Sequence, residues 1–231
     1  MKIHRFIGNF DLTGREVSST DRELINQLKN VLRLSPGDRV QLSSGEGTEA
    51  DATIDTIKSG KVLFSLIGRT QEGIRPSRIV SLYCSILKRE NFELVAQKAT
   101  ECGVSGIVPM ICERTIKTGL NFDRLEKIVR EASEQCGRGT VPTVSPICDW
   151  ETALGLAGEA RQKKILFDRL GDEIPLDLAG PVGIFIGPEG GWTEREIQLA
   201  RKNDCQIASL GNLTLRGETA AIIASYLTVH G

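Results

Sequence analysis

At 231 residues the chain is long enough to bury a substantial core, and its 40% hydrophobic and 26% charged residues are ordinary for a globular protein. A formal net charge of −1 removes the strongly positive field that draws many proteins to nucleic acid without sequence preference. No apolar run approaches the roughly 20 residues that span a bilayer, and the start lacks the long apolar core of a secretion signal, so we expect a cytoplasmic protein.

The cysteines and histidines argue against a metal site. The six cysteines are scattered, without the spacing of a zinc knuckle or a redox pair, and we expect most of them to be buried free thiols. The two histidines, His4 and His230, lie near the two ends of the sequence. A histidine base or a histidine metal cage is therefore not expected, and any chemistry must use other groups.

Residues 1–70 are typical of a small β-barrel. A strand is expected at 3–6, and Ser19 or Thr20 is expected to cap a helix that runs to Leu34. A turn at 35–38 precedes three strand-like runs, at 39–42, 50–57 and 61–67. This unit has no obvious catalytic group, so it suits a binding role.

The polar residues at 71–76 are expected to form a linker, after which the pattern changes. Continuous apolar runs are expected to be buried strands at 79–87, 107–110, 165–167, 182–186 and 205–210. Helices are expected at 91–102, 123–136, 193–202 and 219–229, the first ending at Gly103. This alternation predicts an α/β domain with a parallel sheet over 77–231.

A glycine-rich loop, Gly-Pro-Glu-Gly-Gly at 187–191, follows the strand at 182–186. Its glycines allow positive φ and close approach of backbone amides to a ligand, and Thr193 with Glu196 forms a capping box for the next helix. The loop lacks the Lys-Ser/Thr of a P-loop and carries Glu189, and it does not have the glycine spacing of a dinucleotide fingerprint. The pattern disfavours a polyphosphate and leaves two readings, a rigid turn or a site for a ligand without phosphate.

A second glycine-bearing loop follows one βα unit later, at 210–220. Its leucines, Leu210, Leu213 and Leu215, are apolar where a surface loop would be polar, so they either wall a pocket or thread through the core. Arg216 and Glu218 stand at the start of the last helix, where they could act on a ligand or form an ion pair at the helix end.

Together the two loops closely resemble the signature of SPOUT-class methyltransferases, specifically those that methylate nitrogen-3 of a uridine, of the 1498 type, in bacterial 16S ribosomal RNA. The resemblance extends over essentially the full chain. It includes Lys88, the stretches at 97–104 and 134–138, Pro142, and residues 4–6, 31–34 and 37–38 near the amino end. Gly217 departs from the family pattern, in which a threonine is common at this position.

The resemblance implies a PUA-like, RNA-binding barrel at 1–70 and a trefoil-knotted SPOUT domain at 77–231. It also implies a homodimer that uses S-adenosylmethionine (SAM) and acts on 16S ribosomal RNA in the small subunit, without a membrane or a metal. The implied SAM-binding residues are Phe167, Ile186, Gly187, Gly190, Leu210, Gly211, Leu215 and Thr219.

Methylation of an imide nitrogen requires a group that accepts its proton and a charge that stabilises the resulting anion. Glu218 is the first candidate for the base, Glu101 is the second, and Arg216 is the candidate cation. Expected phosphate contacts are Arg5, Arg33, Lys88, Lys98, Arg114 and Arg138. Two alternatives are a noncatalytic RNA-binding or ribosome-assembly factor and a nucleotide-dependent α/β enzyme.

Overall fold

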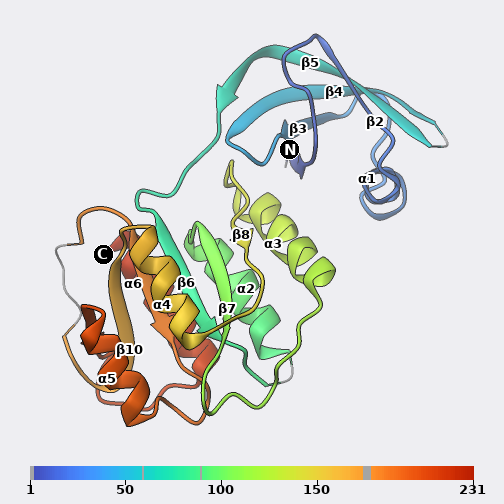
Figure 1. The fold of residues 1–231 in the computed structure, drawn as a ribbon. Helices are drawn as coiled ribbons and strands as arrows, with labels where there is room; N and C mark the ends of the chain where they lie inside the picture. The colour runs from blue at the N-terminus through green and yellow to red at the C-terminus, as the bar shows by residue number, and fades with distance from the viewer. Residues whose placement is uncertain (1–2, 59, 89, 174–177) are drawn as a thin grey trace. The chain divides into compact units, whose positions relative to one another are not determined.

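The computed structural model describes residues 3–58, 60–88, 90–173 and 178–231, and the chain divides into two compact units. The first unit comprises Met1–Arg75 together with Ser133–Val141, and the second comprises Pro76–Ala132 and Pro142–Gly231. In Figure 1 the blue and cyan strands belong to the first unit. The first unit therefore contains a segment, 133–141, that lies far along the chain, within the range expected for the SPOUT domain.

A five-stranded sheet forms the first unit. In chain order its strands are β1 (His4–Ile7), β2 (Glu16–Ser19), β3 (Arg39–Ser43), β4 (Thr48–Lys58) and β5 (Lys61–Glu72). Their order in the sheet is β1-β3-β4-β5-β2, with β1 and β3 parallel and the other neighbours antiparallel. Phe6, Leu42 and Phe64 are fully buried between the sheet and its helix. Because β5 continues to Glu72, the linker expected at 71–76 begins inside a strand.

The N-cap of the helix in the first unit is not one of the two residues predicted for that position. Helix α1 (Arg22–Asn26) continues into one turn of π-helix, η1 (Gln27–Val31). Its N-cap is Asp21, whose carboxylate accepts from the amides of Glu23 at 2.8 Å and Leu24 at 3.4 Å. The predicted cap at Ser19 or Thr20 was wrong, because Ser19 still belongs to β2 and its hydroxyl accepts from the Asp21 amide.

The second unit is an α/β domain with a parallel sheet, which confirms the predicted fold class. Its strands are β6 (Val80–Ser85), β7 (Gly106–Ile111), β8 (Thr143–Val144), β9 (Cys148–Asp149), β10 (Lys163–Asp172), β11 (Val182–Ile186) and β12 (Cys205–Ala208). The sheet order is β12-β10-β11-β6-β7-β8, with β9 also paired to β7, and every pairing is parallel.

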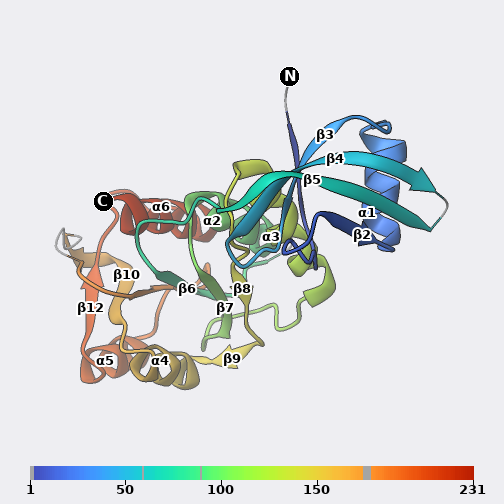
Figure 2. The ribbon, with the colours of Figure 1, turned by 90° about the horizontal axis from the view of Figure 1, so that it is seen from above.

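Helices cover both faces of this sheet. They are α2 (Asn91–Cys102), α4 (Trp150–Glu159), α5 (Glu194–Lys202) and α6 (Gly217–His230), and α3 (Phe122–Cys136) ends in the segment that joins the first unit. Figure 2 shows α2 and α6 on one side of the sheet and α4 and α5 on the other. Helix α2 ends at Gly103 in the left-handed conformation, as predicted.

Because β6, β10, β11 and β12 are parallel neighbours, their carboxyl ends meet at one edge of the sheet. At this edge one loop follows β11 after Ile186 and another follows β12 after Ala208, and the pairing of β10 with β12 is irregular after Phe167. Ligands of open α/β sheets bind at the carboxyl ends of the strands. The fold thus brings the two glycine-bearing loops together at the edge where a ligand site is expected.

Candidate functional site

A cavity of about 650 Å³ opens at this edge of the second unit. Its lining comes from the segments that follow β6, β11 and β12, from the middle of β10, and from the starts of α2 and α6. The lining residues are Lys88, Asn91, 167–169, 186–189, 191–192, 209–211, 213–218 and 220. Its volume falls within the range of about 300–1,000 Å³ that is typical of sites for small organic ligands.

Gly187 and Trp192 set the shape of the first loop. The indole Nε1 of Trp192 donates to the carbonyl oxygen of Phe167 at 3.0 Å, which ties the loop after β11 to β10. A Cβ added at Gly187 would lie 2.9 Å from the indole ring, so a side chain at 187 would displace Trp192. Gly191 has φ +69°, a conformation that favours glycine. These glycines are therefore required by the fold of the loop.

The capping box predicted at Thr193 and Glu196 is confirmed. The Thr193 hydroxyl accepts from the Glu196 amide at 3.3 Å, and Glu196 Oε2 accepts from the Thr193 amide at 2.8 Å. Glu196 is only 2% exposed, and its Oε1 accepts from the Glu113 amide at 2.9 Å. One buried carboxylate thus fixes both the start of α5 and the segment after β7.

Two more contacts hold the first loop in place. Glu189 Oε1 accepts from the Lys88 amide at 2.7 Å, so the anionic residue of the loop is bound to the end of the β6 segment. Arg114 Nη1 donates to the carbonyl oxygens of Gly190 at 2.8 Å and Trp192 at 3.3 Å. Gly190 is not part of the cavity lining, and a Cβ there would lie 3.0 Å from Arg114 Cβ. Gly190 therefore makes room for Arg114, which braces the loop from outside.

The second loop forms the opposite wall. Gly211 has φ +116°, and Ser209 Oγ donates to its carbonyl oxygen at 3.0 Å. Leu210, Leu213 and Leu215 all line the cavity, and Leu213 is 80% exposed. These leucines therefore form part of the wall of the pocket and do not thread through the core, since none of the three is buried in the core.

Arg216 and Glu218 both line the cavity at the amino end of α6. Arg216 is the N-cap residue and Glu218 lies in the first turn, where the helix dipole favours a negative charge. Asn91 Nδ2, from the start of α2, donates to Glu218 Oε2 at 3.3 Å. Among the described residues, the Glu218 carboxylate is therefore hydrogen-bonded to the side-chain amide of Asn91 and not to the guanidinium group of Arg216.

Six of the eight residues expected to bind the cofactor line this cavity. The other two, Gly190 and Thr219, are each adjacent in sequence to residues of the lining. Of the two candidate general bases, Glu218 lines the cavity and Glu101 does not. Glu101 lies on α2, where Lys98 Nζ donates to both of its carboxylate oxygens, at 2.9 and 3.1 Å. Lys88 lines the cavity and Lys98 does not.

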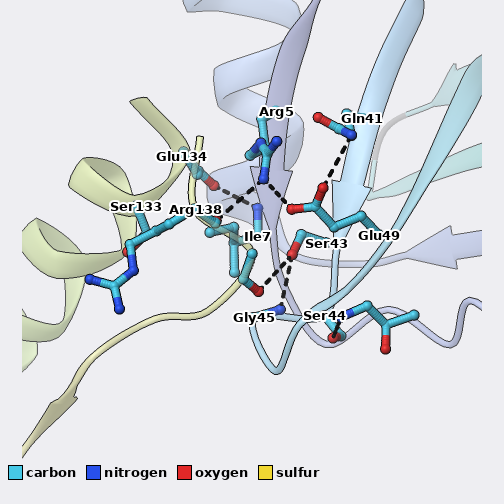
Figure 3. A network of polar contacts seen from close by, with 12 residues as sticks. Arg5, Ile7, Gln41, Ser43, Ser44, Gly45, Glu49, Ser133, Glu134 and Arg138 are labelled. Atoms are coloured by element: carbon cyan, nitrogen blue, oxygen red, sulfur yellow. Dashed lines mark hydrogen bonds and ion pairs between the residues drawn. The ribbon is translucent and has the colours of Figure 1, made fainter. Parts of the chain in front are cut away.

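The remaining basic candidates lie in the first unit, where Arg33 is exposed. Arg5 forms an ion pair with Glu49 and donates to the carbonyl oxygen of Arg138 at 3.3 Å (Figure 3). The Glu134 carboxylate accepts from the Ile7 amide at 2.7 Å in the same network. Arg138 is 5% exposed, and burial lowers the pKa of its guanidinium group. Arg5 and Arg138 therefore make contacts within this unit, and their expected role as phosphate contacts stays a prediction.

All six cysteines are free; three of them are buried, and Cys136 is exposed. Burial raises the pKa of the Cys112 and Cys205 thiols to about 12, so both stay protonated near neutral pH. The described residues contain no cluster of three or more His, Cys, Asp or Glu side chains that could hold a metal ion. In the same part of the chain, no helix has the length and apolarity needed to cross a membrane.

Comparisons with known proteins identify both parts of the chain. A family model described as an RNA methyltransferase domain matches residues 75–228, and one described as an RNA methyltransferase PUA domain matches residues 20–67. The "Ribosomal RNA small subunit methyltransferase E" of Synechocystis is 30% identical over 210 residues, which cover 87% of this chain and 68% of the relative.

Solved structures agree with this match. A ribosomal RNA small subunit methyltransferase E from Neisseria gonorrhoeae, bound to S-adenosyl methionine, superimposes with a TM-score of 0.90 and 29% identity, covering 97% of this chain and 95% of the other. A Legionella pneumophila structure in complex with bound SAM has a TM-score of 0.86 and 28% identity, with 99% and 97% coverage. The chain belongs to the ribosomal RNA small subunit methyltransferase E family, and its match to a PUA domain precedes its match to an RNA methyltransferase domain.

Proposed function

We propose that this chain transfers a methyl group from SAM to nitrogen-3 of a uridine in 16S ribosomal RNA of the small subunit. The observation that carries the proposal is the arrangement of Arg216 and Glu218 on the cavity between the two glycine-bearing loops. A cation and a carboxylate at one ligand site can stabilise an anion and accept a proton, which are the two requirements of this reaction.

The cavity suits SAM in size and in chemistry. Its walls combine apolar side chains, such as Phe167 and Leu215, with loop backbone at Gly187 and Gly211. The relatives from Neisseria and Legionella were solved with SAM bound, which supports the same ligand here. We assign its binding to Phe167, Ile186, Gly187, Leu210, Gly211 and Leu215, with Gly190 and Thr219 as supporting neighbours. The proposal includes trefoil-knot threading of the carboxy-terminal segment.

SAM supplies an electrophilic methyl group on a sulfonium sulfur. The protein must align the uracil nitrogen with that methyl carbon and expose the nitrogen lone pair. In our proposal Glu218 accepts the proton of nitrogen-3, and Arg216 stabilises the negative charge that spreads onto the uracil oxygens. The new bond joins nitrogen-3 to the methyl carbon, while the bond from that carbon to sulfur breaks and sulfur keeps its electron pair.

Glu218 is a better candidate for the base than Glu101 for a geometric reason. A general base must come within hydrogen-bond reach of the proton that it removes. Glu218 lines the cavity, whereas Glu101 lies outside the lining and is paired with Lys98. We therefore assign to Glu101 a structural role on α2.

We further propose that the PUA-like barrel at 1–70 binds RNA, with Arg33 as a contact, and that Lys88 meets the phosphates beside the target base. The target base must leave its stack to reach the cavity, so an assembled RNA surface in the small subunit suits this enzyme. We propose a homodimer that works in the cytoplasm, where small subunits are assembled.

The test is transfer of labelled methyl groups from SAM to small subunits that lack the modification, followed by mass spectrometry of the nucleosides. Wild-type protein should form 3-methyluridine, and Glu218→Gln should lower the rate by about 10²–10⁴-fold, the usual contribution of a general base. Arg216→Ala should lower the rate by about 10²–10³-fold, as the loss of a charge-stabilising group does.

Glu101→Gln is the matched control, because it makes the same change outside the cavity, and it should retain most of the activity. Calorimetry with SAM separates this proposal from the alternatives. Binding of SAM without transfer to any RNA would overturn the function in favour of a noncatalytic RNA-binding or assembly factor. Full activity of Glu218→Gln would overturn only the assignment of the base.

A further inference from the structure

The side chains of Asn91 and Glu218 form a hydrogen bond at the wall of the cavity. Asn91 is the first residue of α2 and Glu218 lies in the first turn of α6, so the contact joins two helix starts on one face of the sheet. Both side chains line the cavity, and Nδ2 of Asn91 is 3.3 Å from Oε2 of Glu218. The amide therefore touches the group to which the proton transfer is assigned.

The chemistry of the two groups fixes the direction of this hydrogen bond. An ionised carboxylate only accepts hydrogen bonds, so the amide must present its NH2 group to Glu218. A hydrogen bond donated to a carboxylate favours the ionised form, which is the form that can accept a proton. Because the Asn91 amide binds Oε2 of Glu218, Oε1 is left to contact a nucleobase in the cavity.

The backbone holds Asn91 in position for this contact. The Asn91 amide donates to the carbonyl oxygen of Lys88 at 3.2 Å, and the Lys88 amide donates to Glu189 at 2.7 Å. The next residue, Phe92, is fully buried. The start of α2 is thus anchored to the core on one side and to the first glycine-rich loop on the other.

We propose that Asn91 is a positioning residue that holds Oε2 of the Glu218 carboxylate and turns Oε1 toward the target uracil. This inference rests on the proposed function, because it acts through the base assigned there. Other charged groups also line the cavity and contribute to its field; they are Lys88, Asp168, Arg169, Glu189 and Arg216. Asn91 differs from them because its neutral amide has a recorded hydrogen bond to the carboxylate itself.

The experiment measures single-turnover methyl transfer to unmodified small subunits across a range of pH. Asn91→Leu removes the donor at similar size, and Asn91→Asp replaces the donor with an acceptor of nearly identical shape. Gln198→Leu is the matched control, since it also replaces an amide with leucine but on the exposed face of α5, outside the cavity. SAM affinity is measured for each variant by calorimetry.

A reaction that uses a carboxylate as its general base should slow at acidic pH. Loss of the amide donor should move this acidic limb upward by about one pH unit, which lowers the rate by up to about tenfold at pH values below the limb and leaves it nearly unchanged at neutral and high pH. Asn91→Asp should move it further, because two neighbouring carboxylates resist ionising together. SAM affinity and the profile of Gln198→Leu should match the wild type.

Superimposable pH profiles for wild type and both Asn91 variants would overturn the proposal, and so would a rate loss that is equal at every pH. If Asn91→Leu does not fold, Asn91→Asp decides the matter, because an acidic residue is favourable at a helix start. A wild-type protein that transfers no methyl group overturns the proposed function as well. Full activity of Glu218→Gln overturns the base assignment and this inference together.

Discussion

The indole of Trp192 donates a hydrogen bond to the main-chain carbonyl of Phe167, 25 residues earlier, at 3.0 Å. Phe167 is in β10 and Trp192 follows the glycine-rich loop after β11, so this one contact closes two sides of the cavity. Both side chains are more than nine-tenths buried. The geometry of the ligand site therefore depends on a side chain that also belongs to the core.

Trp192→Phe should weaken both the fold and the binding of SAM. The substitution removes the hydrogen bond and part of a buried ring, which should cost about 1–3 kcal/mol of unfolding free energy and about a tenfold loss of SAM affinity. Urea denaturation and calorimetry measure the two effects. Trp150→Phe is the control, since Trp150 packs against Trp192 but its Nε1 has no recorded partner among the described residues. Equal loss of SAM affinity in both variants would contradict the role given to the hydrogen bond.

Gly187→Ala should abolish detectable SAM binding. The new methyl group would lie 2.9 Å from the rigid Trp192 ring, so the loop would have to move. Gly155→Ala offers the opposite case, because this helical glycine of α4 has open space around its Cβ position. It should stabilise the protein by about 0.5–1 kcal/mol and leave binding unchanged. Calorimetry and thermal unfolding test both variants, and wild-type affinity in Gly187→Ala would refute the steric argument.

Local signals in the sequence were sufficient for several elements. The apolar run of β11 and the helix α2 have the predicted bounds, and the capping box at Thr193 and Glu196 is present. Each of these depends on residues within a few positions of one another. Helix α4 was missed because glycines at 155 and 158 interrupt its apolar pattern, and its N-cap, Asp149, was the available signal.

Contacts between distant segments could not be predicted in the same way. The packing of residues 133–141 within the first unit brings Arg138 and Glu134 to a network that includes Arg5, more than 120 positions away. No periodicity in either segment indicates this packing, so the sequence alone suggested a phosphate contact for each arginine and not their contact with each other. The contact between Asn91 and Glu218 likewise spans 127 positions and appears only once α2 and α6 pack on the same sheet.

The ion pair of Arg5 and Glu49 should be important for the stability of the first unit. Glu49 is 2% exposed, and burial raises the pKa of its carboxyl group while the nearby Arg5 opposes that rise. Removing one partner of a buried pair leaves an uncompensated charge, so Glu49→Gln should cost about 3–5 kcal/mol of unfolding free energy. Urea denaturation measures this cost, and Glu72→Gln on the exposed end of β5 is the control. SAM affinity should not change, because the cavity is lined by residues of the second unit. A cost below about 0.5 kcal/mol, as for an exposed pair, would contradict the structural role.

The buried thiols should make the protein less stable as the pH rises above 9. Burial raises the pKa of Cys112 and Cys205 from 9.0 to about 12, and it raises that of Tyr83 from 10.0 to about 12. Between these values the unfolded chain has lost protons that the folded protein still holds, so the unfolding free energy falls with increasing pH. Each group contributes a slope of up to about 1.4 kcal/mol per pH unit. Urea midpoints measured from pH 8 to pH 11 should therefore decline less steeply in Cys205→Ala than in the wild type. Cys136→Ala, which removes an exposed thiol, should keep the wild-type slope, and identical slopes in all three proteins would contradict the assignment.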